Sequence, residues 1–93
     1  MTSYEFMKRA KIAIADYINE QHPEMLAGLQ YDWAEIHVVW QCKMLQNHKG
    51  IFCTLAPDEL LFEVTYNGGK EEMYLDVYDK VLNKCIKVNG KEK

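Results

Sequence analysis

The segment from Glu35 to Asn47 constrains the fold of this chain most, because its side chains alternate between apolar and polar residues. The apolar residues fall on one side of an extended chain: Ile36, Val38, Trp40, Cys42 and Met44. The polar residues fall on the other side: His37, Gln41 and Lys43. A period of two with β-branched and aromatic residues is typical of a strand with one buried face. The sequence therefore predicts a strand here whose apolar side faces the core.

The start of the chain has the pattern of a helix N-terminus. Thr2 and Glu5 have the spacing of a capping box, in which each side chain pairs with a backbone N–H of the other residue. A helical projection then groups one apolar stripe: Phe6, Ala10, Ala13, Ile14 and Tyr17, with Met7 and Ile18 at its edge. Ile12 is an exception on the polar side. We expect the helix to end near Gln21 or His22, because Pro23 disfavours helical geometry in the preceding residue.

Three turn signals relate the later strands to the first one. They are residues 46–49, a proline turn at 56–59, and a glycine pair at 68–69 that suits a two-residue primed turn. Counting outward from these turns predicts three layers on one inner face: Trp40/Leu55/Leu60/Val77, Cys42/Cys53/Phe62/Leu75 and Met44/Ile51/Val64/Met73. Cys42 and Cys53 would then be direct neighbours. The sequence thus predicts an α+β fold in which the N-terminal helix packs on a four-stranded antiparallel meander.

The last part of the chain allows two conformations. Helical spacing relates a set of mostly apolar residues: Tyr78, Val81, Leu82, Cys85 and Ile86. Residues 84–88 would equally suit a strand, so we expect a short C-terminal segment that is either helical or extended, and the spacing favours a short helix near residues 79–83. Residues 88–93 are expected to form a frayed polar tail. With 93 residues, the chain is expected to fold as one domain spanning 1–93.

Composition argues against several classes of function. A net charge of −3 and a pI near 5.5 oppose nucleic-acid binding, which depends on neutralising phosphates. The chain has no long apolar run and no signal-peptide pattern, so we expect a cytoplasmic protein that does not bind membranes. Three cysteines without a C-x-x-C pair indicate buried thiols in a reducing compartment. His48 is expected in a surface turn. We predict no metal, no cofactor and no catalytic residues.

Two stretches carry a resemblance to a known family. They are Val38-Val39-Trp40-Gln41-Cys42-Lys43-Met44-Leu45-Gln46-Asn47-His48-Lys49, and Glu63-Val64-Thr65-Tyr66-Asn67-Gly68 followed by Tyr74-Leu75-Asp76. In these motifs the sequence resembles a family of small uncharacterised phage and prophage proteins of Gram-positive bacteria, over residues 6–86. The resemblance implies a phage-encoded accessory protein in bacterial cytoplasm, and it supplies no activity, ligand or catalytic residue.

The predicted outer face of the sheet suggests a function. Large side chains and charges are expected there together, and we assign them to partner binding: Val39, Lys43, Phe52, Leu61, Glu63, Tyr74 and Tyr78. This composition favours a non-enzymatic interaction module that forms a homodimer through the sheet, with Lys43 facing Glu63 of the other copy, or binds a host or phage protein. One alternative is a ligand-binding or enzymatic roll whose pocket, between helix and sheet, is lined by Trp40 and Tyr17. A third possibility, an acidic nucleic-acid mimic, conflicts with the scattered acids.

Overall fold

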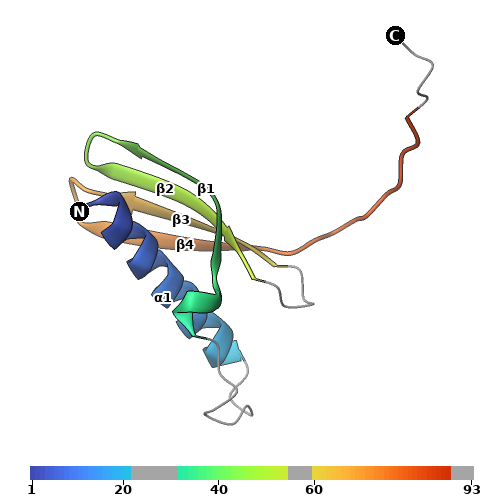
Figure 1. Ribbon diagram of the computed structural model, residues 1–93, viewed down its shortest axis with the longest axis horizontal. Helices are drawn as coiled ribbons and strands as arrows, with labels where there is room; N and C mark the ends of the chain where they lie inside the picture. Colours follow the sequence, from blue (N-terminus) through green and yellow to red (C-terminus); the bar gives the residue numbers. More distant parts are fainter. Residues whose placement is uncertain (22–31, 55–59, 89–93) are drawn as a thin grey trace.

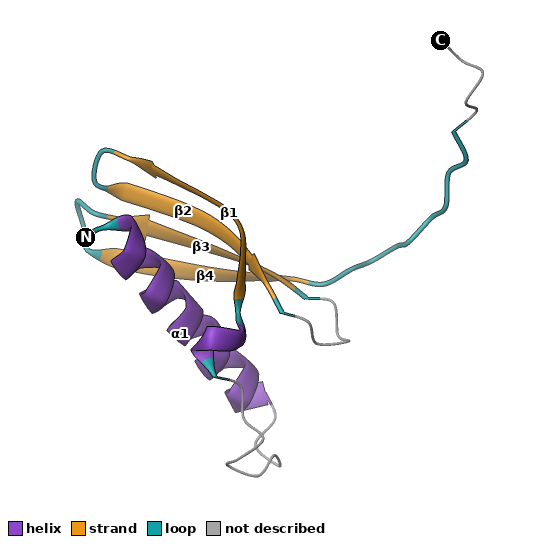
Figure 2. Ribbon diagram, viewed as in Figure 1, coloured by secondary structure: helices purple, strands orange, loops and turns teal. Residues whose placement is uncertain are grey.

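The computed structural model describes residues 1–21, 32–54 and 60–88. Along the chain these form α1 (Ser3–Gln21), the short 3-10 helix η2 (Trp33–Glu35), β1 (His37–Met44), β2 (Asn47–Cys53), β3 (Leu61–Asn67) and β4 (Glu72–Tyr78). The strands pair antiparallel in the order β1-β2-β3-β4, and α1 lies across one face of the sheet (Figure 1, Figure 2). The predicted α+β fold with a four-stranded meander is confirmed.

The helix α1 begins and packs largely as its sequence predicts. The backbone N–H of Thr2 donates to Glu5 Oε1 over 2.9 Å, and the N–H of Glu5 donates to Thr2 Oγ1 over 3.1 Å, which completes the capping box. The buried residues of α1 form one stripe: Phe6, Ala10, Ile14, Ala15 and Ile18. The stripe is rotated slightly from the predicted one, because Ala15 is buried where Ala13 was expected. Ile12 is exposed, as predicted.

Under α1, strand pairing aligns three rows of side chains on the inner face of the sheet: Val38/Phe52/Phe62/Val77, Gln41/Gly50/Val64/Leu75 and Lys43/His48/Tyr66/Met73. Phe52, Phe62 and Val64 are fully buried. The ring of Phe6 stacks on His48 with centroids 4.9 Å apart and lies 6.4 Å from the ring of Phe52. The apolar area removed from water at this interface is therefore the main stabilising contribution of the core.

The predicted orientation of β1 is correct in its first part and wrong beyond Val38. Val38 pairs with Phe52, but Trp40 pairs with Ile51, so Val39 is the extra residue of a β-bulge. Because a bulge shifts the alternation by one residue, the side chains after it exchange faces. Trp40, Cys42 and Met44 therefore lie on the face away from α1, while Gln41 and Lys43 lie on the helix side, opposite to the prediction.

The predicted orientation of β2 is also wrong, because the first hairpin turns earlier than its turn residues suggest. Met44 pairs with Asn47 across a two-residue turn, in which Leu45 has a φ of 57°. Asn47 was predicted to lie in the turn. It is the first residue of β2, and its side-chain Oδ1 accepts a hydrogen bond from the Gly68 N–H over 2.9 Å. His48, predicted in a surface turn, is 2% exposed. Phe52 pairs directly with Phe62, so the even-numbered residues of β2 face the core, and the predicted inner residues Ile51 and Cys53 face outward.

The hairpin between β3 and β4 has the predicted faces but a register that differs by two residues. Asn67 pairs with Glu72 across a four-residue turn, instead of the predicted two-residue turn on Gly68 and Gly69. The Asn67 side chain accepts from the N–H groups of Gly69 and Lys70, and Glu71 has the positive φ, 54°. A shift of two residues preserves the alternation of a strand, so the predicted faces are correct.

Two further predictions concern the pair of cysteines and the proline turn. Cys42 pairs with Lys49, and Cys53 pairs with His37 and Leu61, so the two cysteines are not the direct neighbours that were predicted. The predicted proline turn at 56–59 and the neighbouring Leu55 lie outside the described residues.

The segment after β4, which we call the C-terminal arm (residues 79–88), has no regular secondary structure and is exposed along its length. It runs away from the sheet as an extended chain (Figure 1). Of the two predicted conformations, the helical one is therefore wrong. The end of the predicted frayed tail, residues 89–93, lies outside the described residues.

Replacing Gly50 with alanine should destabilise the fold. A Cβ at position 50 would lie 2.7 Å from Phe52 Cε1 and 3.2 Å from Phe6 Cε2, too close for the packed rings. We expect Gly50→Ala to lower the free energy of unfolding by about 1–3 kcal/mol in urea titrations. As a control, Gly69→Ala should change it by less than about 0.5 kcal/mol, since the nearest atom to its added Cβ would be Asn67 Oδ1 at 3.4 Å. Equal stability of the two variants would contradict this packing.

Candidate functional site

The face of the sheet opposite α1, which we call the outer face, is left open by the described elements (Figure 1). Strand pairing arranges its side chains in three full rows: His37/Cys53/Leu61/Tyr78, Trp40/Ile51/Glu63/Asp76 and Cys42/Lys49/Thr65/Tyr74. Met44 follows Trp40 and Cys42 on the same side of β1. The outer face therefore presents a continuous strip of side chains from all four strands.

Large apolar and aromatic side chains are exposed on the outer face. The exposed fraction is 48% for Trp40, 71% for Met44, 40% for Leu61, 52% for Tyr74 and 49% for Tyr78. Single exposed hydrophobic residues are common on protein surfaces, but a group on one flat face is typical of an interaction surface. Tryptophan and tyrosine are also enriched where binding energy concentrates in interfaces.

A polar network occupies the middle of the outer face. The carboxylate of Glu63 on β3 accepts a hydrogen bond from the hydroxyl of Tyr78 over 2.9 Å and lies 3.0 Å from Lys49 Nζ. The hydrogen bond with Lys49 lowers the pKa of Glu63 below its usual value, and Tyr78 contributes in the same direction. The same contacts raise the pKa of Lys49 and of Tyr78. These three side chains are thereby held in place between the apolar groups.

Four of the seven predicted partner-binding residues lie on the outer face: Leu61, Glu63, Tyr74 and Tyr78. The other three do not lie where the sequence placed them. Phe52 is fully buried against α1 and cannot contact a partner. Lys43 is exposed on the helix side of β1, and Val39 is the exposed bulge residue.

Sequence reasoning assigned five residues of the outer face to the core: Trp40, Cys42, Met44, Ile51 and Cys53. Their apolar character assigned them to the core, since a strand with one buried face normally directs its apolar side inward. The apolar side of β1 and the buried side of the sheet are different sides in this chain. Composition alone does not signal that reversal.

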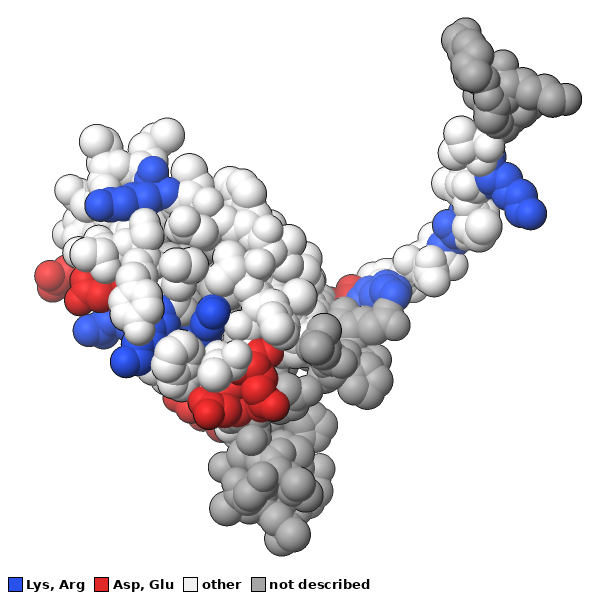
Figure 3. Space-filling view, viewed as in Figure 1, with Lys and Arg blue, Asp and Glu red and all other residues white. Residues whose placement is uncertain are grey.

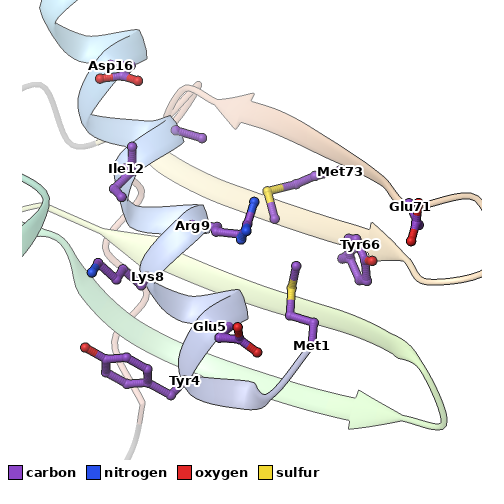
Figure 4. Close-up of a pocket in the computed structure, with 11 residues that line it drawn as sticks. Met1, Tyr4, Glu5, Lys8, Arg9, Ile12, Asp16, Tyr66, Glu71 and Met73 are labelled. Atoms are coloured by element: carbon purple, nitrogen blue, oxygen red, sulfur yellow. The ribbon is translucent and has the colours of Figure 1, made fainter.

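A groove of about 720 Å³ lies on the flank of α1, beside the turn between β3 and β4 (Figure 4). Charged side chains from the helix line it, including Glu5, Lys8 and Arg9. Glu5 belongs to the capping box, and Lys8 Nζ lies 5.5 Å from the centre of the Trp33 ring. The groove does not match the predicted pocket between helix and sheet, because Trp40 lies on the opposite face.

Within the described residues, no three His, Cys, Asp or Glu side chains come together as metal ligands would. None of the helices that the structure describes combines the length and hydropathy needed to cross a membrane.

Comparison with protein families matches residues 7–88 to a family of unknown function (DUF6275). The chain belongs to this family. The DUF6275 match covers the sheet with its outer face and extends through the C-terminal arm. No curated protein and no solved structure matched the chain.

The network at Glu63 should make the stability of this DUF6275 protein depend on acid pH. The folded-state pKa of Glu63 is lowered, so its contribution is complete above the unfolded-state pKa of about 4.3 and is lost as the pH falls through the folded-state value. We expect the free energy of unfolding to fall more steeply for the wild type than for Glu63→Gln between about pH 5 and pH 3.

Lys49→Gln removes the largest cause of the shift and should flatten the pH dependence in the same way. The double variant Lys49→Gln/Glu63→Gln should then show no further flattening beyond Glu63→Gln. Denaturation curves with the same slope against pH for the wild type and Glu63→Gln would contradict the network.

Proposed function

We propose that this chain is a non-enzymatic protein-interaction module that forms a homodimer through the outer face of its sheet. The observation that carries the proposal is the group of exposed large side chains on that face, with Trp40 and Met44 on β1, Leu61 on β3, and Tyr74 and Tyr78 on β4. Burying these side chains against a second protein surface would remove apolar area from water.

The packing of the inner face supports a module over a ligand-binding roll. Phe6, Ile14, Phe52 and Phe62 are fully buried between α1 and the sheet, so side chains occupy the position where the roll would need its pocket. The alternative function, a small ligand-binding or enzymatic roll, would have to use the groove on the flank of α1. The capping-box and ring contacts of Glu5 and Lys8 there favour a structural role for these two side chains.

In a two-fold dimer each copy would cover the outer face of the other, so both outer faces would be buried in the same way. The Lys43–Glu63 pair predicted from the sequence does not fit this dimer, because Lys43 lies on the helix side. Glu63 already pairs with Lys49 in its own chain, so it would enter the interface neutralised.

We further propose that the module is a phage or prophage accessory protein in the cytoplasm of a Gram-positive bacterium. The support is the resemblance of its β1–β2 and β3–β4 motifs to such proteins. A host or phage protein could then bind the same outer face in place of the second copy, since one apolar strip serves either partner.

Trp40→Glu should weaken the dimer. The added carboxylate would have to lose its water among the apolar side chains of the interface, which is costly. In sedimentation equilibrium at micromolar concentration we expect a dimeric wild type, and a dissociation constant at least about tenfold higher for Trp40→Glu. Because Trp40 is half exposed in the single chain, the helix content measured by circular dichroism should be unchanged.

Ile12→Glu is the matched control, because Ile12 is an exposed apolar residue on α1, far from the outer face. It should dimerise as the wild type does. A monomeric wild type would refute self-association. Dissociation by Ile12→Glu and not by Trp40→Glu would place the interface at the flank of α1 instead.

A further inference from the structure

The C-terminal arm exposes apolar side chains for which the rest of the described chain provides no cover. The exposed fraction is 96% for Val81, 74% for Leu82, 71% for Ile86 and 83% for Val88. In an extended chain Leu82, Ile86 and Val88 share one side with Lys80 and Lys84, because side chains alternate with a period of two. One side of the arm therefore combines three apolar side chains with two lysines, which suits an outer face that combines apolar side chains with acids.

The charges of the arm and of the outer face are opposite in sign. The arm carries three lysines, Lys80, Lys84 and Lys87, and one acid, Asp79. Basic side chains recur along it in Figure 3. On β4, which forms one edge of the outer face, Glu72 and Asp76 are acidic. Contact between the arm and this edge would bring opposite charges together, as complementary protein surfaces do.

The arm is long enough to cross a sheet. Ten extended residues span up to about 33–36 Å, whereas four strands spaced by about 4.8 Å cover about 15–20 Å. An extended arm could therefore reach from one edge of the outer face to the other.

The direction of the arm favours the sheet of another copy over its own. The arm continues beyond the end of β4 and leads away from the sheet (Figure 1). To reach its own outer face, it would have to reverse immediately after Tyr78. Of the residues that favour turns, residues 79–88 contain Asp79 and Asn83 but neither glycine, which supplies positive φ at the lowest cost, nor proline.

We propose that the C-terminal arm of each chain lies across the outer face of a second copy, so that the dimer exchanges its arms. The inference rests on the proposed function, since it names what contacts the outer face. Leu82, Ile86 and Val88 pack on the apolar side chains of that face, and the lysines of the arm lie towards Glu72 and Asp76. Each outer face then contacts one arm, and each arm contacts one outer face. This gives the closed two-fold arrangement of a dimer.

Ile86→Glu tests the arm in the full-length chain. The substitution replaces an apolar side chain on the side of the arm that contacts the sheet with a carboxylate, and Ile86 makes no part of the buried core, so the fold of the single chain is retained. We expect a dissociation constant at least about tenfold higher in sedimentation equilibrium. Asn83→Glu adds the same charge on the other side of the arm and should change the constant by less than about threefold.

Cross-linking between isotope-labelled copies tests the exchange itself. Cys85 lies in the arm and Cys42 on the outer face, and both are exposed thiols. In a Cys53→Ser background, a short bis-maleimide applied to mixed ¹⁴N and ¹⁵N chains should link Cys85 of one chain to Cys42 of the other. Mass spectrometry should then find linked peptides with one light and one heavy member.

The outcomes of these experiments distinguish the arm exchange from the outer-face dimer. A dimer that Trp40→Glu dissociates and Ile86→Glu leaves intact would overturn the arm exchange and leave the outer-face dimer standing. Cys42–Cys85 links found only within single chains would likewise overturn the exchange, because the arm would then fold on its own sheet. A wild type that is monomeric at all concentrations would overturn both.

Discussion

The packing of the Phe6 ring against His48 and Phe52 determines which way the sheet faces. His48 and Phe52 lie on the same side of β2, four residues apart, and α1 covers both with one aromatic ring. Gly50 lies between them, where any side chain would collide with the rings. Once the even-numbered residues of β2 are buried, Ile51 and Cys53 must face outward. The composition of the outer face thus follows from the contact between α1 and β2.

The β-bulge at Val39 completes this arrangement. Before the bulge, Ile36 and Val38 follow the predicted orientation, and Ile36 is buried. After it, Trp40 and Met44 lie on the outer face. Without the bulge, Trp40 and Met44 would lie on the helix side of β1, and Gln41 and Lys43 would lie on the outer face instead. A single extra residue therefore decides whether β1 presents polar or apolar side chains on the open side of the sheet.

The sequence correctly predicted those elements in which the type of each residue matches its position in the fold. The capping box at Thr2 and Glu5 places the start of α1, and the regular apolar alternation around Phe62 and Leu75 assigns the faces of β3 and β4. Consequently Leu61, Glu63, Tyr74 and Tyr78 were placed on the correct side.

The errors in strand orientation arise where a residue makes its main contact with residues distant in the sequence. Asn47 and Gly50 have the composition of a turn, but Asn47 binds the next hairpin and Gly50 makes room for two rings. His48, a polar residue, fills a core position. No local pattern reports these roles, so Phe52 was placed on the wrong face. The bulge at Val39 likewise leaves no mark in the alternation of β1.

The environment of Trp40 tests the account most directly, because one side chain reports both the orientation of β1 and the use of the outer face. In a Trp33→Phe background, Trp40 is the only tryptophan. We expect its fluorescence to be quenched readily by acrylamide in dilute protein, and to shift to shorter wavelength and become protected as the concentration rises. A Trp40 that is protected at every concentration, down to the dilute monomer, would place it in the core. A Trp40 that stays open to quencher at every concentration would show that the outer face binds no second copy.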